Sequence, residues 1–87
     1  MSVTINTKKV ERELSWYADN NISVTTLLES KKGRLSRVIE FWKAGEAGNL
    51  IDQYGILDMT RNQFQWIHAS IILIAIQQGD LWEVEIV

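Results

Sequence analysis

The absence of cysteine from a chain of 87 residues is the feature that most restricts how this sequence folds. A domain of this size buries only about two-thirds of the surface that its unfolded chain exposes, so small domains commonly depend on a disulfide, a metal or a partner chain. Without cysteine there is no disulfide and no thiolate metal site. The single histidine, His68, excludes a histidine-rich zinc site. Association of two copies remains, and we therefore predict a homodimer.

The composition is that of a folded protein, with 46% hydrophobic and 23% charged residues. We expect a single domain over residues 1–87. The N-terminal letters MSVTINTKK place their charges after the apolar residues, the reverse of a secretory signal. The longest nearly apolar run, Ala69–Ile76, is far shorter than the ~20 residues that cross a bilayer. These features predict a cytoplasmic protein with no membrane contact.

Apolar residues recur at helical spacing over most of residues 7–78, whereas strict alternation is confined to the two ends. The predicted fold is therefore mainly α, a small helical domain of three to four helices with short N- and C-terminal β-strands. The predicted strands are Ser2–Asn6, which needs the C-terminus or a second copy to pair with it, and Leu81–Val87. The predicted helices are Thr7–Asn20, Ser23–Lys43 with room for a break at Gly33, a short helix within Asn49–Tyr54, and a helix capped by Asp58 or Thr60 that runs to Ile76.

The last of these helices is apolar on two sides, which is typical of a central, buried helix. Its many isoleucines also suit a strand. On the helical interpretation Ile67, Ile71 and Ile74 lie in the core and provide most of the stability. His68, among these apolar residues, is then a packed side chain with one hydrogen-bond partner.

Charge is divided between the two halves of the chain, on either side of a predicted linker at Gly45–Gly48. Residues 1–43 hold eight basic and five acidic residues, a net charge of +3, whereas residues 44–87 have a net charge of −5. Such asymmetry points to a nucleic-acid surface on the basic half, and a dimer doubles its charge. The alternative is two ordinary solvated faces.

No phosphate-binding glycine loop, nucleophile elbow or zinc-protease motif occurs in the sequence. We therefore predict a protein that is not an enzyme and needs no cofactor or metal. Tryptophan is enriched at protein interfaces, and the chain has four. Trp16 lies beside Tyr17 and off the apolar stripe of its predicted helix, so these two residues form the candidate protein-interaction surface.

The order of the first 43 residues is a short strand, a helix, an Asn-Asn turn and a serine-capped helix with the letters NISVTTLL. Over residues 2–43 it resembles the ribbon-helix-helix family of DNA-binding repressors, of the Arc-repressor type. The resemblance implies that two copies pair their N-terminal strands into a ribbon in the major groove. Ser2, Thr4 and Asn6 then face the bases, and Ser23 and Val24 begin the helix that holds a phosphate. The basic residues of the predicted second helix complete the DNA site: Lys31, Lys32, Arg34 and Arg37.

Two functions stay open on the sequence. The first is a small DNA-binding transcriptional regulator, or an antitoxin-like protein, that acts on duplex DNA as a homodimer. The second is an inhibitor or adaptor that binds a host protein, of the anti-defence or anti-CRISPR-like kind that phages and mobile elements encode. The pI of 5.3, the four tryptophans and an acidic half that could mimic nucleic acid favour the second.

Overall fold

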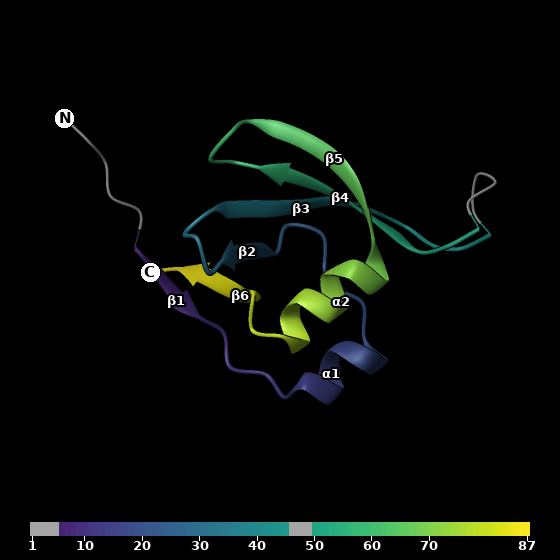
Figure 1. The fold of residues 1–87 in the computed structure, drawn as a ribbon, viewed down its shortest axis with the longest axis horizontal. Helices are drawn as coiled ribbons and strands as arrows, with labels where there is room; N and C mark the ends of the chain where they lie inside the picture. Colours follow the sequence, from purple (N-terminus) through teal and green to yellow (C-terminus); the bar gives the residue numbers. More distant parts are fainter. Residues whose placement is uncertain (1–5, 46–49) are drawn as a thin grey trace.

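The computed structural model describes residues 6–45 and 50–87, which form one six-stranded antiparallel sheet with two short helices on one of its faces (Figure 1). The strand order is β1-β6-β2-β3-β4-β5, so the C-terminal strand pairs between the first two strands of the chain. The elements are β1 (Thr7–Lys9), α1 (Leu14–Asp19), β2 (Leu27–Ser30), β3 (Leu35–Trp42), β4 (Gln53–Asp58), β5 (Gln63–His68), α2 (Ala69–Gln77) and β6 (Leu81–Ile86).

The predicted mainly-α fold is wrong, and the largest error is the helix at Ser23–Lys43. That segment is a hairpin of β2 and β3, with Gly33 in the turn at a φ of +81°. Glycine adopts this left-handed conformation without steric cost, which favours the turn over a continuous helix. β2 is also fixed by pairing with β6, more than fifty residues away. Local periodicity contains no signal for a pairing so distant in the sequence.

The predicted helix start at Asp58 or Thr60 is a β-turn between β4 and β5. The Asp58 carboxylate accepts hydrogen bonds from the backbone N–H groups of Thr60 at 2.9 Å and Arg61 at 3.1 Å. Asn62 ends the turn with a φ of 54°, a conformation that asparagine tolerates well. The same residues that cap helices therefore open a hairpin here, and the helix begins only at Ala69.

The ends of the chain follow the predicted pattern only in part. β6 occupies Leu81–Ile86, as the alternation indicates, and β1 pairs with it in the register Thr7↔Ile86. The predicted strand Ser2–Asn6 lies outside the described residues except for Asn6, which is exposed. Of the predicted linker, only Gly45 is described. The predicted helix Thr7–Asn20 is reduced to α1. Of the short helix predicted within Asn49–Tyr54, Asn49 lies outside the described residues, residues 50–52 are neither helix nor strand, and Gln53 and Tyr54 begin β4.

The core lies between the sheet and the two helices, which lie beside each other on the same face (Figure 1). Val38 and Leu28, from the middle of the sheet, are 0% and 1% exposed. Because α2 begins at Ala69, its buried positions are Ile72 and Ile76, three and seven residues further on. The prediction that Ile71 and Ile74 are buried is wrong, since they are 55% and 50% exposed. The remaining core side chains are Ile22, Tyr54 and Ile56.

Candidate functional site

The predicted DNA-binding residues do not gather on one surface in the part of the chain that the structure describes. Ser2 and Thr4 lie outside it, and Asn6 precedes β1. Ser23 and Val24 lie exposed in the loop between α1 and β2, where the Ser23 carbonyl accepts the Thr26 N–H at 3.1 Å. A turn thus replaces the helix start that was expected to hold a phosphate. The basic side chains are divided: Lys31, Lys32 and Arg34 are exposed at the β2–β3 turn, whereas Arg37 lies within β3.

The predicted interface residues Trp16 and Tyr17 are half-buried on α1 and belong to a cluster that ties α1 to β6. The Tyr17 hydroxyl donates to Glu83 Oε1 at 3.0 Å, and Arg12 Nε donates to the same oxygen at 2.9 Å. The Arg12 guanidinium lies 4.3 Å from the centre of the Trp16 ring. These contacts give both aromatic residues a structural role. Burial, and secondly the hydrogen bond to Glu83, raises the pKa of Tyr17 to about 12.

This raised pKa predicts a loss of stability in alkali. The unfolded chain releases the tyrosine proton near pH 10 and the folded chain near pH 12, so the folded state binds more protons between them. The contribution of Tyr17 to stability is therefore complete below pH 10 and is lost as the pH rises to 12. Glu83→Gln removes the carboxylate charge, so we expect the pKa of Tyr17 to fall. Spectrophotometric titration of the tyrosinate band measures it, with Tyr17→Phe to assign the signal.

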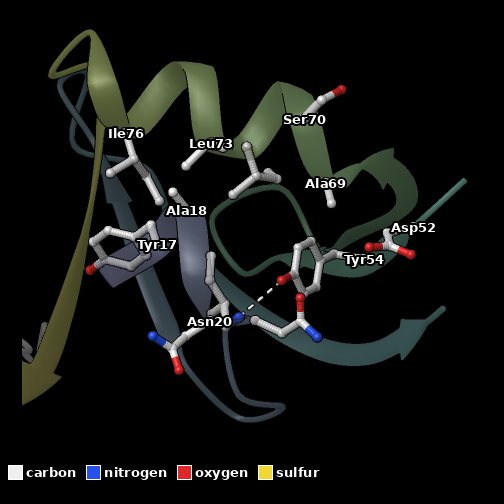
Figure 2. Close-up of a pocket in the computed structure, with 12 residues that line it drawn as sticks. Tyr17, Ala18, Asn20, Asp52, Tyr54, Ala69, Ser70, Leu73 and Ile76 are labelled. Carbon is white, nitrogen blue, oxygen red and sulfur yellow. Dashed lines mark hydrogen bonds between the residues drawn. The ribbon is translucent and has the colours of Figure 1, made fainter. Parts of the chain in front are cut away.

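The space between α1 and α2 holds a cavity of about 160 Å³ (Figure 2). Tyr54 reaches it from β4, and its hydroxyl accepts the Ile22 N–H at 2.9 Å. Burial raises the pKa of Tyr54 above its ordinary value. This hydrogen bond holds the loop before β2 against the sheet, and apolar side chains of α2 close the other side. We interpret the cavity as a gap in packing between the helices.

The face of the sheet opposite the helices is covered by neither of them. On β6, Leu81 packs against the helix-side core and Glu83 meets Tyr17, so the alternate residues Trp82 and Val84 point to the other side. The strand registers then place one row of residues across all six strands on that side. We call this side the open face, and its central row is Lys9, Val84, Leu27, Arg37, Leu57 and Phe64.

Over β1, β6 and β2 the open face is sealed by its own side chains. The Glu29 carboxylate accepts hydrogen bonds from Thr7 Oγ1 at 3.1 Å and from Trp82 Nε1 at 3.2 Å, and so links all three strands. In the register of these strands, the bond from Thr7 to Glu29 crosses the row that contains Val84 and Leu27. Both residues are buried, although neither helix covers this face.

Over β3, β4 and β5 the open face carries an aromatic cluster of Trp42, Phe64 and Trp66. The ring centres of Trp42 and Trp66 lie 4.6 Å apart, and those of Phe64 and Trp66 lie 5.4 Å apart. Gly55 lies beneath Phe64 and Trp66, and a Cβ added there would approach the Phe64 ring to 2.9 Å. The rings thus pack directly on the backbone and yet stay 37–47% exposed.

A bulge in β3 brings Trp42 into this aromatic cluster. Val38 pairs with Ile56, but the next register pair is Glu40 with Gly55, so one extra residue is inserted at Ile39. Without it, Trp42 would share the face of Val38 and point toward the helices. The bulge therefore places the ring of Trp42 on the open face.

Arg37 lies between the sealed half and the aromatic cluster. Its row neighbours are Leu27 on β2 and Leu57 on β4, both apolar. Arg37 Nε is buried and has no hydrogen-bond partner. An unsatisfied buried donor costs about 1–3 kcal/mol of stability. The open face thus combines exposed aromatic rings with an arginine whose hydrogen bonding is incomplete.

Sequence reasoning missed this surface because the segments that contain Trp42 and Phe64 were predicted to be helices, Ser23–Lys43 and the helix that runs to Ile76. The signal that could have found it is the segment QFQWIH, in which polar and apolar residues alternate as in a strand. His68, expected on an apolar helix, is the exposed last residue of β5.

Comparison of the chain with known protein families, with curated proteins and with solved structures finds no match. Within residues 6–45 and 50–87, no group of three histidine, aspartate or glutamate side chains is placed to hold a metal ion. No helix in these ranges is long and apolar enough to cross a membrane. The function is therefore inferred from the surfaces of this chain alone.

Proposed function

We propose that this protein is a small protein-binding module, an inhibitor or adaptor without catalytic chemistry, and that its partner docks on the open face. The observation that carries the proposal is the exposed aromatic cluster of Trp42, Phe64 and Trp66 on a sheet face that neither helix covers. Tryptophan and arginine dominate the energetic centres of protein interfaces. The aromatic cluster presents two tryptophans, and Arg37 lies beside it on the same face.

The two features define the chemistry of the partner. The aromatic cluster accepts an apolar or aromatic side chain, because its rings are fixed in place and lose little freedom on binding. We expect the terminal nitrogens of Arg37 to donate hydrogen bonds to a carboxylate or a carbonyl oxygen of the partner. Phe64 lies two strands from Arg37 in the same row, about 10 Å away. A partner with an acidic and an apolar side chain at that spacing fits the open face.

The charge of the open face favours a protein over a nucleic acid. Binding to single-stranded nucleic acid also uses aromatic rings, but it combines them with a groove of basic residues along the backbone. Here Glu29 and Glu40 share the face with Lys9 and Arg37, and the chain as a whole has a net charge of −2. Arg37 is thus a local site for one anion in a surface of mixed sign.

The test is the affinity of the purified partner for variants of the open face, measured by calorimetry after the partner has been captured with the wild-type protein and identified. Truncation of an interface centre costs about 2 kcal/mol or more, so Trp66→Ala should weaken binding about 30-fold. The matched control is Ile71→Ala, which removes an exposed apolar side chain from the helix side. Equal affinity of Trp66→Ala and wild type would contradict the proposal.

The same variants separate the proposal from DNA binding. A duplex-DNA binder loses affinity with salt at a log–log slope of about −0.9 per phosphate contact. If the wild type binds duplex DNA with such a slope, and Lys31→Ala reduces the slope while Trp66→Ala leaves it unchanged, the regulator function replaces the one proposed here. We expect no measurable duplex binding.

A further inference from the structure

The two edges of the sheet differ in how they are protected against pairing with another chain. β1 is three residues long and contains Lys8 and Lys9, two features that discourage edge-to-edge association. β5, at the other edge, is six residues long and has neither a charged residue nor a proline: its sequence is QFQWIH. No bulge interrupts its register with β4. β5 is therefore the edge that is open to a further strand.

The backbone groups that β5 offers follow from its pairing with β4. The Ala69 N–H donates to the Asp52 carbonyl at 3.0 Å, directly after the last strand pair. Hydrogen-bonded and non-hydrogen-bonded pairs alternate along an antiparallel ladder, so Ile67 and Gln65 direct their backbone groups toward β4. Phe64 and Trp66 then direct their N–H and C=O groups outward, away from the sheet.

We propose that β5 pairs antiparallel with β5 of a second copy of this chain, about a twofold axis at Gln65. The axis is perpendicular to the sheet, so the two sheets continue into one. Phe64 then lies opposite Trp66 of the partner subunit, and each of these two equivalent pairs exchanges reciprocal backbone hydrogen bonds. The absence of charge from β5 lets two identical strands meet without repulsion between like charges.

This register also explains why a second copy suits the edge. Residues that face each other across an antiparallel pair share one face of the sheet, so Phe64 and Trp66 of the partner subunit meet on the open face as an aromatic cross-strand pair. The two aromatic clusters become continuous, and both open faces point to the same side. The pairing goes beyond the proposed function, since it joins two binding surfaces and leaves each of them accessible.

The test is sedimentation equilibrium of the full chain at about 100 µM, with charge variants at the axis. Gln65 is exposed, and the twofold axis places it opposite its own copy. Gln65→Lys and Gln65→Glu should each sediment as a chain of 10.0 kDa, whereas the wild type should have twice that mass. An equimolar mixture of the two variants should return to the dimer mass, because opposite charges then meet. Gln77→Lys, at the exposed end of α2, is the control and should stay dimeric.

Amide hydrogen exchange tests the pairing without any substitution. In the dimer the N–H groups of Phe64 and Trp66 should be protected in the wild type, and Gln65→Lys should expose them. The pairing would be overturned if the wild type sedimented at 10.0 kDa or if the Gln65 variants stayed dimeric. It would also be overturned if the mixture of the two Gln65 variants stayed monomeric, or if the amides of Phe64 and Trp66 exchanged rapidly in the wild type. A monomeric wild type whose partner binding still depends on Trp66 would overturn the dimer and leave the proposed function standing. If the wild type is a dimer and its affinity for the partner does not depend on Trp66, the dimer stands and the proposed function is overturned.

Discussion

Replacement of Ile72 by alanine is expected to lower the free energy of unfolding by about 2–5 kcal/mol, the range for truncation of a large buried aliphatic side chain. Ile72 is 5% exposed and belongs to the core between α2 and the sheet. The whole stability of a domain is only about 5–15 kcal/mol. The melting temperature of so small a domain should therefore fall by roughly 10 °C or more. Urea unfolding followed by circular dichroism measures the change.

Ile71→Ala is the matched control, since the two isoleucines are adjacent on the same helix and differ mainly in burial. At 55% exposure, Ile71 should contribute less than about 1 kcal/mol. The sequence prediction assigned the large effect to Ile71, so the pair of variants tests the phase of α2 directly. A larger loss for Ile71→Ala than for Ile72→Ala would show that the helix is rotated about its axis.

Arg37→Met is expected to change stability and partner binding in opposite directions. The substitution removes a buried donor without a partner, and methionine fills a similar volume, so the free energy of unfolding should rise by about 1 kcal/mol. The affinity for the partner should fall about 10-fold or more, because a charged hydrogen bond contributes about 1.5–3 kcal/mol.

Arg37→Lys separates the charge of this residue from its geometry. Lysine keeps the positive charge but has no planar group that can bind a carboxylate through two parallel hydrogen bonds. We expect it to restore only part of the affinity that Arg37→Met loses. A destabilised Arg37→Met protein would show that the guanidinium has a structural role, and unchanged affinity would show that the partner does not contact it.

The part of the fold that could be predicted from the sequence is the part fixed by short-range pattern. The alternation in Leu81–Val87 identified β6, because that strand is polar on one side and apolar on the other. β2 and β3 were missed because apolar residues on both faces of a hairpin can also fit a helical period. Pairing partners decided between the two, and β2 pairs with a strand from the other end of the chain. Which residues of α2 face the core likewise depends on the residue at which β5 ends and the helix begins.

The candidate site was less predictable than the fold for a related reason. Tryptophan is enriched at interfaces in general, and from the sequence the contact surface was predicted at Trp16. In the structure, Trp16 packs against Arg12 and Tyr17. The aromatic cluster is assembled from β3 and β5, whose relative position depends on β4 between them. Trp42 reaches that face only through the one-residue bulge at Ile39. A single inserted residue in a strand leaves no trace in local composition.

The measurement that tests the central claim most directly is site-specific photo-crosslinking in the cells that make the protein. A benzophenone side chain replaces Phe64 on the open face in one variant and Ile71 on the helix side in another. Both positions are about half exposed, so they meet solvent and bystander proteins to a similar extent. From position 64 we predict a discrete adduct with one partner protein, larger in mass than a crosslinked dimer of this chain. From position 71 we predict no adduct. Adducts of equal yield from both positions, or an adduct from position 71 alone, would contradict the assignment of partner binding to the open face.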